Sequence, residues 1–299
     1  MSTVDPPLQA PESGRATRFA PSPSGYLHLG HAFSALTAYR WARANDARFL
    51  LRIEDIDLAR CKPAFEEAIY QDLAWLGLTW EEPVRRQSEH FDFYRDALDQ
   101  LIEKGLVYRC FKTRREIAED IERAPHLAPD GPEGPAYVGA PLDPASEQNL
   151  LEAGAAFAWR LSMEKTQDFL GPAFNHLDVC LTEAETDRIV SVQANPAQFG
   201  DVILARKDFG TSYHLSSVVD DALQGITHVI RGDDLRAAAD LHRLLQVLLD
   251  LPETLYLHHR LLTDENGERL SKRQKSLTLR ALREEGNSPE DIAGMVRLG

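Results

Sequence analysis

Hydrophobic and polar positions along the chain follow a helical period in several long stretches. Apolar residues recur three and four positions apart over residues 62–77 and 88–106, where Ser88 and Gly105 provide start and stop signals for the second helix. A strongly apolar stretch over residues 237–251 predicts another helix, which a following proline ends. We expect these helices to be structural, with their aromatic side chains in the core.

Shorter runs predict strands whose ends face a ligand. Residues 48–53 are mostly apolar and are followed at once by the acidic group 54–57, which indicates a buried parallel strand. Residues 213–234 contain two short β-rich runs, and the second ends at Arg231. Open α/β sheets bind ligands at the carboxyl ends of their strands, so both strand ends are candidate binding positions. A turn with solvated acids is the alternative for residues 54–57.

A turn-rich stretch near the N-terminus, residues 18–31, has the pattern of a strand, a tight loop and a helix start. His28 and His31 are three apart at the beginning of a helix-like run over residues 32–44, so their rings stand side by side at the positive end of the helix dipole. Gly30 lets a flat base or a phosphate approach the backbone. This arrangement receives phosphate, although a solvated cap is the alternative for two histidines alone.

The whole stretch resembles the HIGH signature of class I aminoacyl-tRNA synthetases. The sequence Arg-Phe-Ala-Pro-Ser-Pro over residues 18–23 is similar to the glutamyl branch of that class. Late in the chain, Arg-Leu-Ser-Lys-Arg over residues 269–273 resembles the KMSKS loop of the family. The resemblance covers residues 17–275 and implies an α/β fold: a Rossmann-like class I synthetase catalytic domain with an inserted α+β subdomain.

The resemblance also implies how the chain is divided. The Pro-, Ser- and Gly-rich start has no apolar periodicity and predicts a disordered tail. After the basic loop only 26 residues remain, too few for an anticodon-binding domain, and Ser288 begins a short helix there. We expect a tail over residues 1–15 and a first Rossmann half with the HIGH-like motif over residues 16–108. An inserted acceptor-binding-like subdomain follows over residues 109–206, with strands at 157–161 and 201–206. The second Rossmann half then covers residues 207–262, and the KMSKS-like loop with C-terminal helices covers residues 263–299.

Site residues follow from the same resemblance. An arginine fork suits a carboxylate and rejects a neutral amide, so Arg231 favours glutamate over glutamine as the substrate. Lys272 brings a mobile point charge to the leaving phosphates, and His28, His31 and Lys272 are the catalytic candidates. The implied ATP-binding residues are His28, Gly30, His31 and Lys272, and the implied glutamate-binding residues are Arg18, Phe19, Ala20, Pro21, Ser22, Glu54, Tyr213 and Arg231.

The family's zinc knuckle is incomplete in this chain. Many glutamyl-type enzymes hold zinc with a Cys-x-Cys pair and a later tyrosine and cysteine, but here Cys110 is followed two positions on by Lys112, and Tyr137 by no cysteine until Cys180. One thiolate and one phenol do not make a four-ligand site. We expect no zinc, a knuckle held by packing, and three reduced cysteines that form no disulfide framework.

The implied reaction is the ATP- and Mg²⁺-dependent activation of L-glutamate to glutamyl-adenylate by a ligase. The short C-terminal segment resembles the branch that then transfers glutamate to the queuosine base in the anticodon loop of tRNA(Asp). Two alternatives stay open. One is a minimal glutamyl synthetase that charges a tRNA 3′ end, and the other is a catalytically silent paralogue that binds glutamate or RNA.

Composition limits the partners. The net charge of −14 means that RNA contacts must be local, because RNA affinity depends on neutralised phosphates. Residues 269–283 contain six basic and no acidic residues, so this stretch is a candidate contact for RNA. The alternative is a basic helix face exposed to solvent. No apolar run approaches the ~20 residues of a membrane span. We expect a cytoplasmic monomer without membrane contact.

Overall fold

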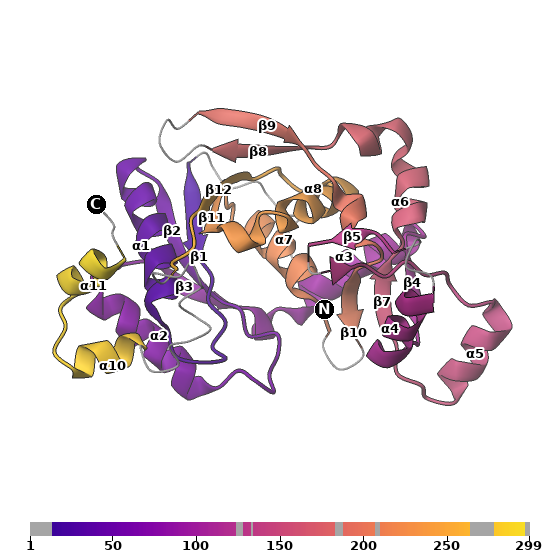
Figure 1. Ribbon diagram of the computed structural model, residues 1–299, viewed down its shortest axis with the longest axis horizontal. Helices are drawn as coiled ribbons and strands as arrows, with labels where there is room; N and C mark the ends of the chain where they lie inside the picture. The colour runs from indigo at the N-terminus through magenta and orange to yellow at the C-terminus, as the bar shows by residue number, and fades with distance from the viewer. Residues whose placement is uncertain are drawn as a thin grey trace, which may run out of the picture.

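The computed structural model describes residues 14–123, 128–132, 134–182, 188–206, 210–263 and 278–296. The predicted tail, apart from Gly14 and Arg15, and the KMSKS-like loop with Lys272 lie outside these residues. Three groups of elements follow one another across the molecule in Figure 1: C-terminal helices on the left, parallel strands in the middle and the inserted subdomain on the right. Within the described residues, no helix is long and apolar enough to cross a membrane.

The first half is a parallel sheet in the order β1-β2-β3 with helices between its strands. The prediction of a buried parallel strand over residues 48–53 is confirmed, since five of the six residues of β2 are buried. Gly105 ends the second helix with a φ of +72°, as expected. That helix starts later than predicted, because Ser88 binds Asp55 instead of capping it. The elements are β1 Ala16–Phe19, α1 Leu29–Ala44, β2 Arg48–Ile53, α2 Pro63–Trp75, β3 Glu81–Arg86 and α3 Phe91–Glu103.

The second half continues the first, because Thr227, just before β11, exchanges hydrogen bonds with Ala16 of β1. Parallel strands β11 and β12 extend to β8, whose antiparallel partner β9 forms the edge. Strands β8 and β9 therefore belong to this sheet, although they precede it in the chain (Figure 1). The elements are β8 Asp178–Thr182, β9 Ile189–Gln193, α7 Tyr213–Leu223, β11 His228–Gly232, α8 Ala238–Leu248 and β12 Leu255–His259.

The prediction of a β-rich run at the start of residues 213–234 is wrong, because this stretch is helix α7. Ser212 caps the helix, with its Oγ accepting from the N–H of Leu215. Leu215, Val218 and Val219 are three and four positions apart and pack together, so the β-branched residues serve a helical face. Tertiary packing thus outweighs their strand propensity.

The inserted subdomain is an antiparallel sheet in the order β10-β7-β4, and the two strands predicted within it are confirmed. Asp201, 2% exposed, holds it together by accepting hydrogen bonds from Tyr108 at 2.7 Å and from the N–H groups of Gly139 and Met163 at 2.9 Å. The elements are β4 Val107–Cys110, α4 Arg114–Arg123, β5 Asp130–Gly131, β6 Gly134–Pro135, α5 Pro144–Glu152, β7 Ala158–Leu161, α6 Met163–Leu170 and β10 Ile203–Arg206.

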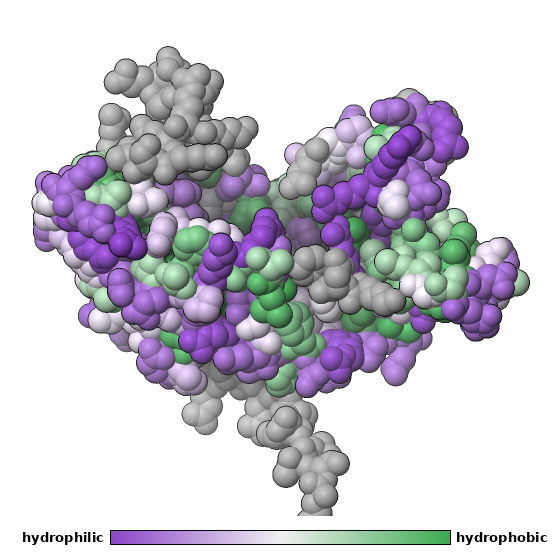
Figure 2. All heavy atoms as spheres, turned by 90° about the horizontal axis from the view of Figure 1, so that it is seen from below, coloured by the Kyte–Doolittle hydropathy of each residue, from purple (hydrophilic) through white to green (hydrophobic). Residues whose placement is uncertain are grey.

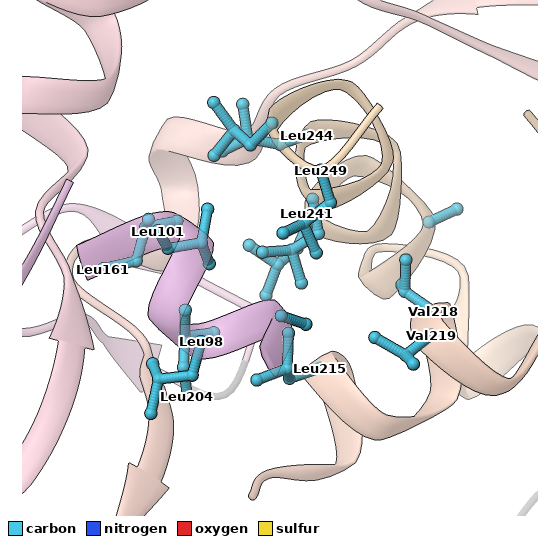
Figure 3. Close-up of a cluster of buried hydrophobic side chains, with 14 of the residues drawn as sticks. Leu98, Leu101, Leu161, Leu204, Leu215, Val218, Val219, Leu241, Leu244 and Leu249 are labelled. Carbon is cyan, nitrogen blue, oxygen red and sulfur yellow. The ribbon is translucent and has the colours of Figure 1, made fainter. Parts of the chain in front are cut away.

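One core joins the inserted subdomain to the Rossmann sheet. Leucines of α3, β7 and β10 meet the apolar faces of α7 and α8 (Figure 3). Leu161, Leu204 and Leu215 are fully buried there. The subdomain is therefore fixed relative to Tyr213 at the start of α7. Seen from below, the surface is hollowed between the two sides of the molecule, and much of it is polar (Figure 2).

Two helices follow the undescribed loop, α10 Leu279–Glu284 and α11 Pro289–Met295. Ser288 caps the second, as predicted, with its Oγ accepting from the N–H of Asp291 at 3.2 Å. The chain returns from the loop beside the histidine turn, since the N–H of Leu279 donates to the carbonyl of Leu27 at 2.8 Å and Thr278 bridges to His28. The loop therefore ends at the first half of the fold.

Candidate functional site

A cavity of about 370 Å³ opens at the carboxyl ends of β1, β2, β11 and β12. It lies where the two halves of the sheet meet, which is where open α/β sheets bind ligands. Every predicted site residue except Lys272, which is outside the described residues, lines it: Arg18, Phe19, Ala20, Pro21, Ser22, His28, Gly30, His31, Glu54, Tyr213 and Arg231. Segments more than 200 positions apart thus form one wall.

His28 and His31 cap helix α1 and are neutral. Nδ1 of His28 accepts from the N–H of Gly30 at 3.1 Å, and Nδ1 of His31 accepts from the N–H of His28 at 3.2 Å. Burial lowers the pKa of His28, and burial with the neighbouring His28 lowers the pKa of His31 to about 3. Each ring therefore carries its proton on Nε2. The helix start offers two uncharged N–H donors, which suit phosphate oxygens.

Gly30 keeps this arrangement open. A Cβ atom at this position would lie 2.9 Å from Cε1 of His28, an atom of the imidazole ring that caps the helix. A side chain at position 30 would therefore require the His28 ring to shift, so a glycine at this position preserves the cap.

A buried ion cluster supports the opposite wall. Nε of Arg18 donates to Asp221 at 3.0 Å, and Nη1 of Arg52 donates to Asp221 at 2.7 Å. Nη2 of Arg52 also holds Glu54 at 2.9 Å. Burial alone would raise the pKa of Asp221, but the charges of Arg18 and Arg52 outweigh burial and leave this pKa lowered. Burial raises the pKa of Glu54 against the same two arginines.

Arg231 is different, because it is a buried cation that has no carboxylate partner among the described residues. The residue is 4% exposed, and no ion pair joins it to any described acid. Its Nε and Nη1 lie 3.4 Å from ring nitrogens of His258 and His242, and its guanidinium lies 4.9 Å from the centre of the Tyr256 ring. Nη2 is buried and has no partner within the described part of the chain.

The two histidines beside Arg231 stay uncharged at neutral pH. Burial and the charge of Arg231 lower the pKa of His258 to about 3 and that of His242 well below its usual value. A buried cation without a counter-ion among the described residues is costly, so Nη2 is a candidate position for an anion. Burial raises the pKa of Tyr213, so its hydroxyl remains a donor beside this position.

Both ends of the KMSKS-like loop border the cavity. Leu261 and Leu262, just before it, line the wall. Thr278, just after it, bridges to His28. The described residues on either side of this loop therefore lie beside the histidine turn and the cavity, and Lys272 lies outside the described residues.

Comparison with known proteins agrees with this geometry. The family model for class I tRNA synthetases (E and Q), catalytic domain, matches residues 16–299. The chain belongs to this family. It is similar to the glutamyl-Q tRNA(Asp) synthetase of Rhodobacter capsulatus, with 46% identity over 94% of this chain and 99% of that protein.

Longer members of the family share the same region. The glutamate–tRNA ligase of Aquifex aeolicus is 38% identical over 92% of this chain, which spans 55% of that enzyme. The solved structure of the glutamate–tRNA synthetase from Elizabethkingia anophelis superimposes with a TM-score of 0.75 at 28% identity, over 96% of this chain and 61% of that one. The expected class I catalytic fold is thereby confirmed.

The side chains at the positions where the resemblance implies zinc ligands form a different arrangement in this chain. Cys110 and Tyr137 are buried and pack together with Tyr108. Lys112, where a second cysteine would stand, donates to Asp120, and its Nζ lies 5.9 Å from the centre of the Tyr137 ring. Among the described residues, no group of three or more metal-ligating side chains forms. One thiol and one phenol beside an ammonium do not fit zinc.

Several residues that shape the site were not predicted from the sequence. Arg52 and Asp221 form the ion cluster, and His242 and His258 surround Arg231. Arg52 carried a usable signal, because a charged residue inside an apolar strand needs a buried partner. The histidines carried none. The remaining unpredicted lining residues are Ser34, Ile230, Gly232, Asp234, Leu235, His259, Leu261 and Leu262.

The ion cluster makes a testable contribution to stability. Asp221→Asn leaves two buried arginines short of a counter-charge and should lower the free energy of unfolding by about 3–5 kcal/mol at pH 7 in urea titrations. The matched control is Glu81→Gln, which breaks the exposed pair with Arg48 and should cost at most about 1 kcal/mol.

The effect of Asp221→Asn depends on pH with a defined sign. The pKa of Asp221 is lower in the folded protein than its ordinary 3.8, so its ionised form stabilises the fold above that pH. The difference between wild type and variant should be constant at neutral pH and shrink as the pH falls below about 4. Equal losses for both variants at pH 7 would contradict the assignment.

Proposed function

We propose that this protein activates L-glutamate with ATP to glutamyl-adenylate and transfers the glutamyl group to the queuosine base of tRNA(Asp). The observation that carries the proposal is the cavity itself, in which neutral imidazole donors for phosphate face the anion position at Arg231. The similarity to the Rhodobacter protein, over nearly its full length, supports the choice of acceptor.

Activation needs positioning more than covalent chemistry. An oxygen of the glutamate α-carboxylate attacks the α-phosphorus of ATP, and the bond to pyrophosphate breaks. Nε2–H groups of His28 and His31 donate to phosphate oxygens from the start of α1, and Lys272 brings its charge to the leaving pyrophosphate. A Mg²⁺ ion, when bound with ATP, screens the phosphate charges.

The amino-acid head and side chain are held on the other wall. Nη2 of Arg231 donates to the side-chain carboxylate, with Arg18 beside it. Glu54, already fixed by Arg52, takes the α-ammonium group, and Tyr213 covers the substrate. In the second step a nucleophilic group of the base attacks the activated carbonyl carbon, and AMP leaves. Water must be excluded at this stage, because it would hydrolyse the adenylate.

One alternative has support of its own. The Aquifex relative is named a glutamate–tRNA ligase, and its similarity to this chain is compatible with charging of a tRNA 3′ end. The two proposals share the activation step and differ in the acceptor, so the acceptor decides between them.

The acceptor is tested by transfer of labelled glutamate. We expect glutamate-dependent ATP/pyrophosphate exchange without tRNA, and transfer to tRNA(Asp) that carries queuosine but not to the same transcript lacking the modified base. Lys272→Ala should abolish exchange. Transfer to tRNA(Glu), or equal transfer to both forms of tRNA(Asp), would reject the queuosine acceptor, and absence of exchange in the wild type would reject activation.

We also propose that the knuckle is held without zinc, by packing of Cys110 against Tyr137 and by the ammonium of Lys112. Protein purified from zinc-supplemented culture should contain far less than one zinc per chain by emission spectroscopy, and a chelator should leave the Tm unchanged. Lys112→Met should cost at most about 1 kcal/mol, since the pair with Asp120 is half exposed. Stoichiometric zinc whose removal lowers the Tm would contradict this.

A further inference from the structure

His242 lies behind the cavity residues Arg231 and Tyr213 and does not line the cavity itself. It is on the buried face of α8 and is 1% exposed. Its Nδ1 lies 3.4 Å from Nη1 of Arg231, and the centre of its ring lies 5.6 Å from the centre of the Tyr213 ring. One histidine therefore supports two residues of the proposed glutamate pocket from the protein side.

The hydrogen bonds of His242 have a defined direction. Arginine can only donate, so Nδ1 of His242 accepts from Nη1 of Arg231. A neutral imidazole has one N–H group, which is then on Nε2. Nε2 lies 3.2 Å from Nδ1 of His214 on α7. The donors thus point from Arg231 to His242 and on to His214, and the second bond fixes which nitrogen of His242 accepts.

The other histidine beside Arg231 is held less firmly. Nε of Arg231 donates to Nε2 of His258 at 3.4 Å, but Nδ1 of His258 is buried and has no partner among the described residues. Together the two rings occupy Nε and Nη1 and leave Nη2 for the cavity. Since both ring nitrogens of His242 bond to described residues, His242 is the stronger candidate for fixing the plane of the guanidinium.

We propose that His242 is a positioning residue that sets the preference of Arg231 for a carboxylate. Its neutral acceptor orients the guanidinium without cancelling the charge, so Nη2 meets the side-chain carboxylate of glutamate as a full cation. A carboxylate at position 242 would instead pair with Arg231 and compete with the substrate. The inference rests on the proposed function, because it explains how the glutamate pocket obtains its selectivity.

Two substitutions of equal size separate position from charge. His242→Asn keeps a neutral acceptor near the place of Nδ1, and His242→Asp puts a carboxylate there. In glutamate-dependent ATP/pyrophosphate exchange, the Asp variant should have a KM for glutamate at least about tenfold above that of the Asn variant, the value of one charged hydrogen bond. The preference for glutamate over glutamine should fall by a similar factor. The two kcat values should differ much less, because the affected bond forms away from the reacting α-carboxylate.

His214→Phe tests the hydrogen-bond chain one residue further from the cavity. The phenyl ring keeps the packing beside Phe199 but removes the acceptor for Nε2–H of His242. The tautomer of His242 with its proton on Nδ1 then becomes accessible, and it faces Arg231 with a donor. We expect the KM for glutamate to rise about fivefold, the value of one neutral hydrogen bond. His214→Asn, whose amide oxygen can accept in the same place, should restore most of this loss.

The matched control is Gln246→Leu on the same helix. Gln246 is 2% exposed and donates to Thr254 at 3.0 Å, and neither residue lines the cavity. Loss of this bond should lower the Tm, yet KM and the preference for glutamate should stay within about twofold of wild type. A purely structural role of His242 would give this same pattern in its variants.

Equal KM values and equal preferences in the Asp and Asn variants of His242 would overturn the inference. An unchanged KM in His214→Phe would overturn it as well, so the test does not depend on the folding of the Asp variant. Absence of exchange in the wild type would instead reject the proposed activation. The rise in Tm caused by L-glutamate would then decide the role of His242, because glutamate should stabilise the Asn variant more than the Asp variant, and equal shifts would contradict it.

Discussion

The carboxylate of Asp221 is the contact on which the site depends. It is buried and binds Arg18 of β1 and Arg52 of β2, which lie 203 and 169 positions away in sequence. Because both arginines need this carboxylate, α7 cannot move away from the first half of the sheet without exposing or orphaning a charge. The same contact sets the orientation of α7 and therefore the position of Tyr213 at its start.

Arg231 differs from the arginines of the ion cluster. Among the described residues, both buried arginines of that cluster have an acid, because Arg18 and Arg52 share Asp221. Around Arg231 the protein places neutral histidines and an aromatic ring, which leave its charge available. In the proposed site, the described residues therefore separate two tasks, with uncharged imidazole donors at the phosphate side and the unpaired Nη2 of Arg231 at the amino-acid side.

Sequence reasoning predicted much of this arrangement, and its failures have physical causes. The motif residues from Arg18 to His31, with Glu54, Tyr213 and Arg231, line one cavity because short signatures fix local backbone geometry at strand ends. Asp221 was not singled out, since its role depends on pairing with residues over 160 positions away. Helix α7 was mistaken for strand because its β-branched residues face a core that only the tertiary fold creates.

The central claim is that the cavity selects a carboxylate through Arg231, and calorimetric titration tests it most directly. Non-hydrolysable sulfamoyl analogues of glutamyl-adenylate and glutaminyl-adenylate differ only in the group that meets Nη2 of Arg231. The account predicts that the glutamyl analogue binds at least about tenfold more tightly, the value of one charged hydrogen bond, and that Arg231→Gln removes this preference. Equal affinities of the wild-type protein for the two analogues would contradict it.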